Sequence, residues 1–242
     1  TIFIGTRPEA IKLSPVVKEF KKFREIDTRV ILTGQHKEMV SNVLNLFEIK
    51  SDANLNIMKP NQDLTYITTE SLIGLTEELL NNKPNLVLVQ GDTTTAFAGA
   101  LAAFYQKIPV AHIEAGLRTN DIFNPFPEEV NRRLISQIAT IHFTPTSMTR
   151  KNLLDQNVQG LIVQTGNTVI DSLLMIKKQK NNFKINGLNI KKQKYILLTI
   201  HRRENWGKNI EVIAIAIKKI LSKNKSINFL LPLHKNQVIR NS

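Results

Sequence analysis

The chain has 242 residues, 42% of them hydrophobic, with no cysteine and a formal net charge of +13 at pH 7. This length and apolar content suffice for one large globular domain or two smaller ones. The lack of cysteine excludes disulfide bridges and thiolate metal sites, and no apolar run reaches the roughly 18 residues of a membrane helix. We therefore expect a globular cytoplasmic protein with no membrane partner.

The positive charge is concentrated toward the C-terminal end of the sequence. Fourteen of the 33 lysine and arginine residues lie between Lys177 and Lys225, where Glu204 and Glu211 are the acidic residues. Nucleic-acid sites combine basic residues with aromatic side chains that stack on bases, and this stretch contains no motif of that kind. We interpret the charge as a solvated lysine-rich surface and expect no nucleic-acid partner.

Short runs of β-branched and aliphatic residues alternate along the chain with longer amphipathic segments. In the first of these segments, Ala10, Leu13, Val17 and Phe20 recur at helical spacing among charged residues. This alternation predicts an α/β fold with a doubly wound parallel sheet. The expected strands are Thr1–Ile4, Thr28–Leu32, Leu86–Gln90, Val110–Ile113 and Ile141–Phe143. The expected helices are Ala10–Phe20, Leu64–Leu80, Thr94–Tyr105, Glu129–Ile138, Ser147–Leu154 and Thr168–Ile176.

A lysine-rich segment separates this region from a second one. Hydrophobic periodicity is lost over Lys177–Lys194, as is typical of a connection between domains. Beyond it, the sequence predicts a strand, a helix and a strand, and one such unit does not bury both faces of its sheet. We expect an N-terminal Rossmann-like domain over 1–170, a connecting helix and linker over 171–194, and the first part of a second Rossmann-like domain over 195–242. The second domain is therefore expected to be incomplete in this chain. The three elements expected there are Tyr195–Ile200, Asn209–Leu221 and Ile227–Leu231.

The loop after the first expected strand has features of an anion site. Gly5 allows a tight turn, and Thr6 with Glu9 forms a T-x-x-E capping box, which leaves the helix N-terminus able to accept an anion. Arg7 and Lys12 add positive charge. The pattern alone fits an ordinary strand–helix junction equally well, and it lacks the further glycines of a dinucleotide-binding fingerprint.

Three acidic residues lie next to ends of elements that are expected to meet at one edge of the sheet. Asp92 follows a hydrophobic strand, Glu114 follows the next strand between His112 and Arg118, and Glu128 precedes a helix. Taken singly, Asp92 is more simply a helix cap, Glu114 fits a structural ion pair, and Glu128 fits a carboxylate at a helix N-terminus. Taken together, the three acids beside two cations suit proton transfer next to a departing anion.

The histidines give no sign of a metal site. None of the five has HxxxH or HxH spacing, and neither a Walker loop nor a G-x-S-x-G elbow occurs. We expect no metal, no P-loop chemistry and no serine hydrolase. His201 directly follows the first strand of the second region, where it is either a group that titrates or binds a diphosphate, or an ordinary loop histidine.

Seven motifs occur in order along the chain. They are GTRPEAIK (Gly5–Lys12), TGQHKEM (Thr33–Met39), QGDTTT (Gln90–Thr95), HIEAGLRT (His112–Thr119), PFPEEVNRR (Pro125–Arg133), TGNTVID (Thr165–Asp171) and HRREN (His201–Asn205). Together they resemble bacterial non-hydrolysing UDP-N-acetylglucosamine 2-epimerases, from the first residue to about His234. The resemblance implies a glycosyltransferase-B-like pair of Rossmann-type domains, usually in a homodimer, and no cofactor.

The same resemblance implies an activity. In the family, UDP leaves by anti elimination across C1 and C2, giving 2-acetamidoglucal, and readdition delivers a proton to the other face of C2. The expected reaction is therefore reversible conversion of UDP-N-acetylglucosamine to UDP-N-acetylmannosamine, which feeds surface polysaccharide synthesis. UDP-N-acetylglucosamine is also the expected allosteric activator.

The resemblance also suggests roles for individual residues. The catalytic residues that it implies are Asp92, Glu114, Glu128 and His201. Substrate binding is expected at Arg7, Lys12, Arg118 and Arg202, of which Arg202 also resembles part of a regulatory site. The other regulatory positions are Gln35, His36, Gln62 and His234, although the family usually carries glycine in the loop around Gln62.

Several alternatives stay open. A relative acting on another UDP-2-acetamido sugar fits many of the same motifs, and a hydrolysing 2-epimerase would release free N-acetylmannosamine instead. A non-catalytic nucleotide-sugar sensor would share the scaffold without the chemistry. The family's C-terminal Ser-Gly-Gly-Glu-type segment is absent from these residues, so the 242 residues by themselves are expected to be inactive.

Overall fold

The structure is a computed structural model that describes residues 1–35, 37–179, 192–199 and 208–232. The contacts divide the chain into two compact units, Thr1–Gln179 and Lys180–Ser242. The predicted boundary at residue 170 lies inside a helix of the first unit, α7 (Thr168–Lys178). Among the described residues, none of the helices has the length and apolar character needed to span a membrane.

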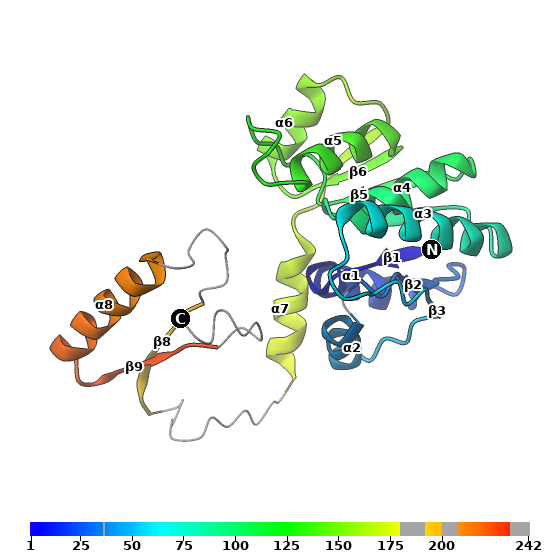
Figure 1. The fold of residues 1–242 in the computed structure, drawn as a ribbon. Coiled ribbons are helices and arrows are strands. Elements are labelled where there is room, and N and C mark those ends of the chain that lie inside the picture. The colour runs from blue at the N-terminus through cyan, green and yellow to red at the C-terminus, as the bar shows by residue number, and fades with distance from the viewer. Residues whose placement is uncertain (36, 180–191, 200–207, 233–242) are drawn as a thin grey trace. The chain divides into compact units, whose positions relative to one another are not determined.

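A seven-stranded, wholly parallel sheet forms the centre of the first unit (Figure 1). Its order is β3-β2-β1-β4-β5-β6-β7, so the direction of winding reverses between β1 and β4. This is the doubly wound arrangement that the sequence predicts. The strands are β1 (Ile2–Ile4), β2 (Val30–Leu32), β3 (Ala53–Asn54), β4 (Val87–Gln90), β5 (Val110–Ile113), β6 (Ile141–Thr144) and β7 (Leu161–Gln164).

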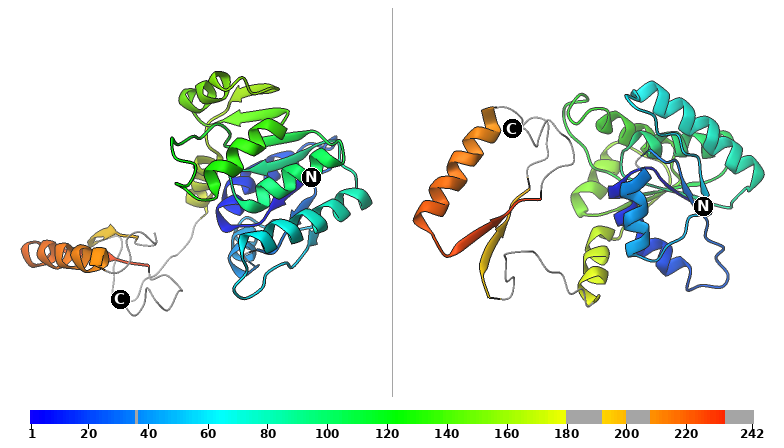
Figure 2. Two further views of the ribbon diagram at one scale, coloured as in Figure 1. Left: turned by 45° about the horizontal axis from the view of Figure 1, so that its top comes forward. Right: turned by 60° about the horizontal axis from the view of Figure 1, so that its bottom comes forward.

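Helices cover both faces of this sheet. On one face, α1 packs against α2 and α7, and on the other face α4 packs against α3 and α5. The right-hand view of Figure 2 shows the two layers, with the blue and yellow-green helices on one side and the cyan and green helices on the other. Besides α7, the helices of the unit are α1 (Arg7–Phe20), α2 (Lys37–Leu46), α3 (Leu64–Asn81), α4 (Thr94–Tyr105), α5 (Glu128–Ile138) and α6 (Ser147–Asp155).

The core follows from the alternation of side chains along each strand. Ile2 and Ile4 of β1 face the α1 layer, whereas Phe3 between them faces the α4 layer. All three side chains are buried, as expected for a parallel sheet that is covered on both faces. The buried strands therefore hold the loops at their carboxyl ends in a fixed frame.

Three elements of the first unit are missing from the sequence prediction. The strand β3 has only two residues, which is too short for a visible pattern. The strand β7 lies at the edge of the sheet with its side chains half-buried or exposed, so its pattern is weak. The helix α2 does carry a signal, because Val40, Val43, Leu44 and Phe47 recur at helical spacing and are buried.

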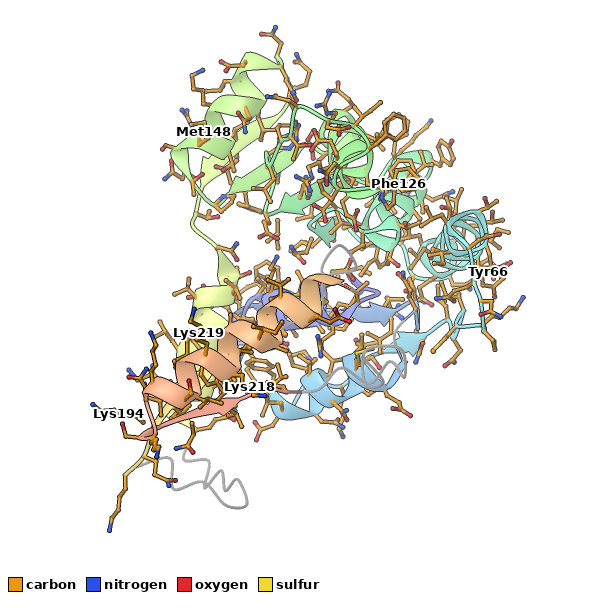
Figure 3. The ribbon with its side chains drawn as sticks, turned by 60° about the vertical axis from the view of Figure 1, so that its left-hand side comes forward. Tyr66, Phe126, Met148, Lys194, Lys218 and Lys219 are labelled. Carbon is orange, nitrogen blue, oxygen red and sulfur yellow. The ribbon has the colours of Figure 1, made fainter. Side chains whose placement is uncertain are left out.

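The second unit contains two parallel strands, β8 (Lys194–Leu197) and β9 (Ile227–Leu230), and the helix α8 (Lys208–Lys223). This agrees with the predicted strand–helix–strand unit. Figure 3 labels Lys194, Lys218 and Lys219, which are exposed on β8 and α8. These three lysines of the basic stretch are therefore solvated, as the charge pattern predicts.

Candidate active site

The predicted loops meet at the carboxyl ends of β1, β4 and β5. In a doubly wound sheet, ligands bind beyond these ends, at the point where the strand order reverses. That point lies between β1 and β4. The loop at Gly5 follows β1, the loop at Asp92 follows β4, and Glu114 follows β5.

Glu114 is held by three different elements. Its Oε2 accepts hydrogen bonds from Lys12 Nζ of α1 and Gln90 Nε2 of β4. Its Oε1 accepts a hydrogen bond from Asn167 Nδ2, 2.7 Å away, at the N-cap of α7. The backbone of Glu114 has φ of 65°, a left-handed conformation that is costly for a residue with a side chain. The three hydrogen bonds therefore hold the carboxylate in one position, and the backbone that carries it is strained.

Asp92 is paired with an arginine rather than with a helix end. Its Oδ2 lies 2.7 Å from Arg132 Nη2, and its carbonyl oxygen accepts a hydrogen bond from Asn131 Nδ2 at 3.0 Å. The N-cap of α4 is Thr93, whose side chain accepts from Ala96 N. The simpler interpretation of Asp92 as a helix cap is therefore wrong, because its neighbour takes that role.

The charges around Asp92 come from several elements. Burial raises the pKa of Asp92, Arg132 lowers it, and Glu128 and Glu114 raise it, while Lys12 lowers it. Glu128 is the first residue of α5 and is half-buried. The structure thus brings Asp92, Glu114, Glu128 and Lys12 into one electrostatic environment, which is the grouping that the sequence predicts.

Glu9 is a member of the site whose wider contacts the sequence does not reveal. The Glu9 half of the predicted capping box is formed, because the Glu9 carboxylate accepts hydrogen bonds from Thr6 N at 2.7 Å and from Gly5 N at 2.6 Å. It also accepts from the Thr93 hydroxyl, which joins the loop after β1 to the loop after β4. Glu9 is 1% exposed, and burial raises its pKa.

We expect Glu9→Gln to destabilise the protein. Three donors point at this carboxylate, and an amide offers only one acceptor oxygen, so at least one buried donor loses its partner. The expected loss in the free energy of unfolding is about 1–3 kcal/mol. Urea unfolding of this variant beside Glu19→Gln, which changes an exposed glutamate of α1, measures the difference. Equal midpoints for the two variants and the wild type would contradict this prediction.

The two predicted cations of α1 have different surroundings. Lys12 is committed to the ion pair with Glu114. Arg7 is exposed at the first residue of α1, and within the described part of the chain no carboxylate forms an ion pair with it. Of the two, Arg7 has the freer charge for an anion at the helix N-terminus.

Arg118 and His112 hold structural positions. Arg118 Nε donates to Gln156 at 2.8 Å and its Nη2 donates to Ser136 at 2.9 Å, and burial lowers its pKa to about 10. The predicted role of Arg118 in substrate binding has no support from these contacts. His112 is fully buried with Nε2 2.7 Å from the Gly91 carbonyl, and burial lowers its pKa to about 3, so it stays neutral.

Two of the predicted regulatory residues lie beside one surface hollow. Gln35 accepts from the Thr95 hydroxyl at 2.8 Å, and Gln62 accepts from Lys59 N at 3.1 Å. Gln35 follows Gly34 in the chain, and Gln62 is hydrogen-bonded to Lys59. Both Gly34 and Lys59 line a hollow of about 500 Å³. The lining residues are Gly34, Asn56, Met58, Lys59 and Pro60. The other predicted residues His36, His201, Arg202 and His234 lie outside the described residues.

A doubly wound sheet with clustered carboxylates at its switch point is an arrangement of α/β enzymes and nucleotide-binding proteins. The model of the UDP-N-acetylglucosamine 2-epimerase family matches residues 18–242. The chain belongs to this family.

Individual relatives agree with this assignment. The UDP-N-acetylglucosamine 2-epimerase of Neisseria meningitidis is 49% identical over 99% of this chain and 66% of its own length. The crystal structure of the N. meningitidis enzyme bound to UDP-GlcNAc has a TM-score of 0.87 at 48% identity, covering 99% of this chain and 67% of that one. The S. aureus MnaA–UDP co-structure has a TM-score of 0.89 at 43% identity, covering 99% and 63%.

These matches confirm the predicted glycosyltransferase-B-like α/β fold class. The chain spans about 62–66% of the length of the curated relatives that it matches.

Proposed function

We propose that the full-length gene product catalyses reversible epimerisation at C2 of UDP-N-acetylglucosamine, giving UDP-N-acetylmannosamine. The observation that carries this proposal is that Asp92 and Glu114 follow neighbouring strands beside the switch point of the sheet, where the charge of Glu128 on α5 also acts on Asp92. The family assignment and the relative that was solved with UDP-GlcNAc support the choice of substrate.

The chemistry requires a base and an anion site, because no carbonyl acidifies the C2 proton of the sugar. A carboxylate takes this proton, the C2–H electron pair forms a double bond with C1, and the C1–O bond breaks so that UDP leaves with its electron pair. For the reverse addition, UDP attacks C1 and a carboxylic acid gives a proton to the opposite face of C2. Asp92, Glu114 and Glu128 supply these groups, and fixed positions lower the barrier to transfer.

The departing diphosphate needs positive charge that is not already neutralised. Arg7 and the N-terminus of α1 offer such charge, whereas Lys12 is paired with Glu114 and serves to orient it. We assign His201 and Arg202 to the diphosphate as well, on the basis of the family motif that they match. Arg118 is left out of this assignment because its hydrogen bonds hold α5 and α6 together.

We also propose that a second UDP-N-acetylglucosamine molecule regulates the enzyme at the hollow beside Gln35 and Gln62. Its position supports this role, because the hollow is formed by residues after β2 and β3 rather than by the carboxylate loops. His36 and His234 are the further members that the family motifs supply. The proposal includes a homodimer in the cytoplasm whose product serves surface polysaccharide synthesis.

The product distinguishes this function from its rivals. We expect the full-length protein, incubated with UDP-N-acetylglucosamine and no added NAD or metal, to give an equilibrium mixture with UDP-N-acetylmannosamine that NMR detects. Release of free N-acetylmannosamine with UDP would indicate a hydrolysing enzyme. If the protein turned over only another UDP-2-acetamido sugar, that sugar would be its substrate. Binding without turnover would identify a sensor.

A further inference from the structure

One face of the first turns of α5 is directed at Asp92. Glu128, Asn131 and Arg132 stand at positions i, i+3 and i+4 of the helix and therefore share a face. Asn131 Nδ2 donates to the backbone carbonyl of Asp92 at 3.0 Å, and Arg132 Nη2 lies 2.7 Å from the carboxylate. Successive residues of one helix thus hold the main chain and the side chain of the same aspartate.

Arg132 is itself held from behind. It is 8% exposed, and its Nη1 lies 3.4 Å from Glu129 Oε2. Glu129 is fully buried and is fixed by Arg133 Nε at 2.6 Å and by Thr119 N at 3.0 Å. A guanidinium is a rigid, planar fork, so an arginine held by Glu129 presents Asp92 with one fixed direction of approach.

We propose that Arg132 is a positioning residue of the reaction: braced by Glu129, it orients the Asp92 carboxylate and balances its charge for proton transfer at C2. This inference rests on the proposed function. It goes further because it gives a role to a residue outside the groups assigned above, and that residue acts through its ion pair with Asp92.

The surrounding charges support this role. Asp92 is flanked by Glu114 and Glu128, which together with burial raise its pKa, and by two cations that lower it. One of these cations, Lys12, is already bonded to Glu114. Among the residues that the structure describes, Arg132 is the cation that forms an ion pair with Asp92. Its loss frees the carboxylate to rotate and raises the pKa of Asp92, so a larger fraction of Asp92 is protonated at any given pH.

The test compares three variants of the full-length enzyme. Arg132→Gln removes the charge, Arg132→Lys keeps a charge but not the fork, and Arg150→Gln makes the same change at an exposed arginine of α6.

We expect Arg132→Gln to lower kcat by about 100-fold, the cost of a small misplacement of a reacting group. KM should change much less. The limb of the pH profile of kcat/KM that follows Asp92 should move to higher pH. Arg132→Lys should restore part of kcat and return the limb toward its wild-type position, and Arg150→Gln should match the wild type.

A purely structural ion pair predicts a different result. In that case the Arg132 variants would melt at lower temperature, yet the folded fraction would keep the wild-type kcat and pH profile, and this outcome would overturn the proposal. If Arg132→Gln does not fold, Arg132→Lys alone decides, since an unchanged kcat in that variant also contradicts the role of the fork. A wild-type enzyme without epimerase activity would instead count against the proposed function, which separates the two failures.

Discussion

Asp92→Asn is expected to lower kcat by about 10²–10⁴-fold, the range that general acid–base groups contribute, while the protein stays folded. The amide has nearly the same shape and still presents an oxygen to Arg132 Nη2, so the contacts of the loop after β4 are largely kept. The amide cannot accept or return the C2 proton. Initial rates of conversion of UDP-N-acetylglucosamine, beside circular dichroism to follow folding, measure this effect.

The matched control is Asp155→Asn, which changes an exposed aspartate at the end of α6. It removes the same charge outside the group formed by Asp92, Glu114 and Glu128, so kcat should stay unchanged. A folded Asp92→Asn enzyme that turns over as fast as this control would remove Asp92 from the mechanism, and with it the reason for the Arg132 proposal.

Glu114→Gln is expected to reduce kcat by a similar factor, about 10²–10⁴-fold, but also to reduce stability. Lys12 and Gln90 both donate to one carboxylate oxygen and Asn167 donates to the other. An amide replaces one acceptor oxygen by an NH₂ group that meets a donor, and it leaves Lys12 without its anion. The expected loss in the free energy of unfolding is about 1–3 kcal/mol.

Two measurements on the same sample separate these effects. Urea unfolding gives the loss of stability. Initial rates, measured without urea at a temperature where the variant is folded, give the loss of kcat. Glu19→Gln, at an exposed position of α1, is the control for both. A variant that loses stability but keeps its rate would show that Glu114 only holds the loops together.

The fold was predictable wherever burial leaves a repeating pattern in the sequence. The central strands are short apolar runs because both faces of a parallel sheet are covered, and α1 shows its buried face at helical spacing. The edge strands β3 and β7 escape prediction because one has two residues and the other has no fully buried side chain. At an edge, solvent replaces one of the partners that would otherwise impose a pattern.

The positions of the site residues were also predictable, but their partners were not. Topology places residues after parallel strands at one edge, which brings Asp92 and Glu114 together. The contacts that fix them come from far along the chain: Asn167 lies 53 residues from Glu114, and Thr93 lies 84 residues from Glu9. Such pairs have no fixed spacing, so only the folded chain reveals them.

Neighbours in the sequence can also mislead. His112 and Arg118 flank the motif around Glu114, yet His112 belongs to β5 and is buried inside the sheet. Arg118 lies beyond the turn and hydrogen-bonds to Ser136 and Gln156 of other elements. The left-handed backbone at Glu114 turns its side chain toward Lys12 and Asn167 instead.

The most direct test of the carboxylate mechanism is proton exchange at C2. The full-length enzyme is incubated with UDP-N-acetylglucosamine in D₂O, and C2 of both sugars is followed by NMR. We predict that UDP-N-acetylmannosamine appears with deuterium at C2 and that deuterium also enters the recovered UDP-N-acetylglucosamine. UDP-N-acetylmannosamine that forms with its original C2 hydrogen would contradict a mechanism in which carboxylates exchange that proton with solvent.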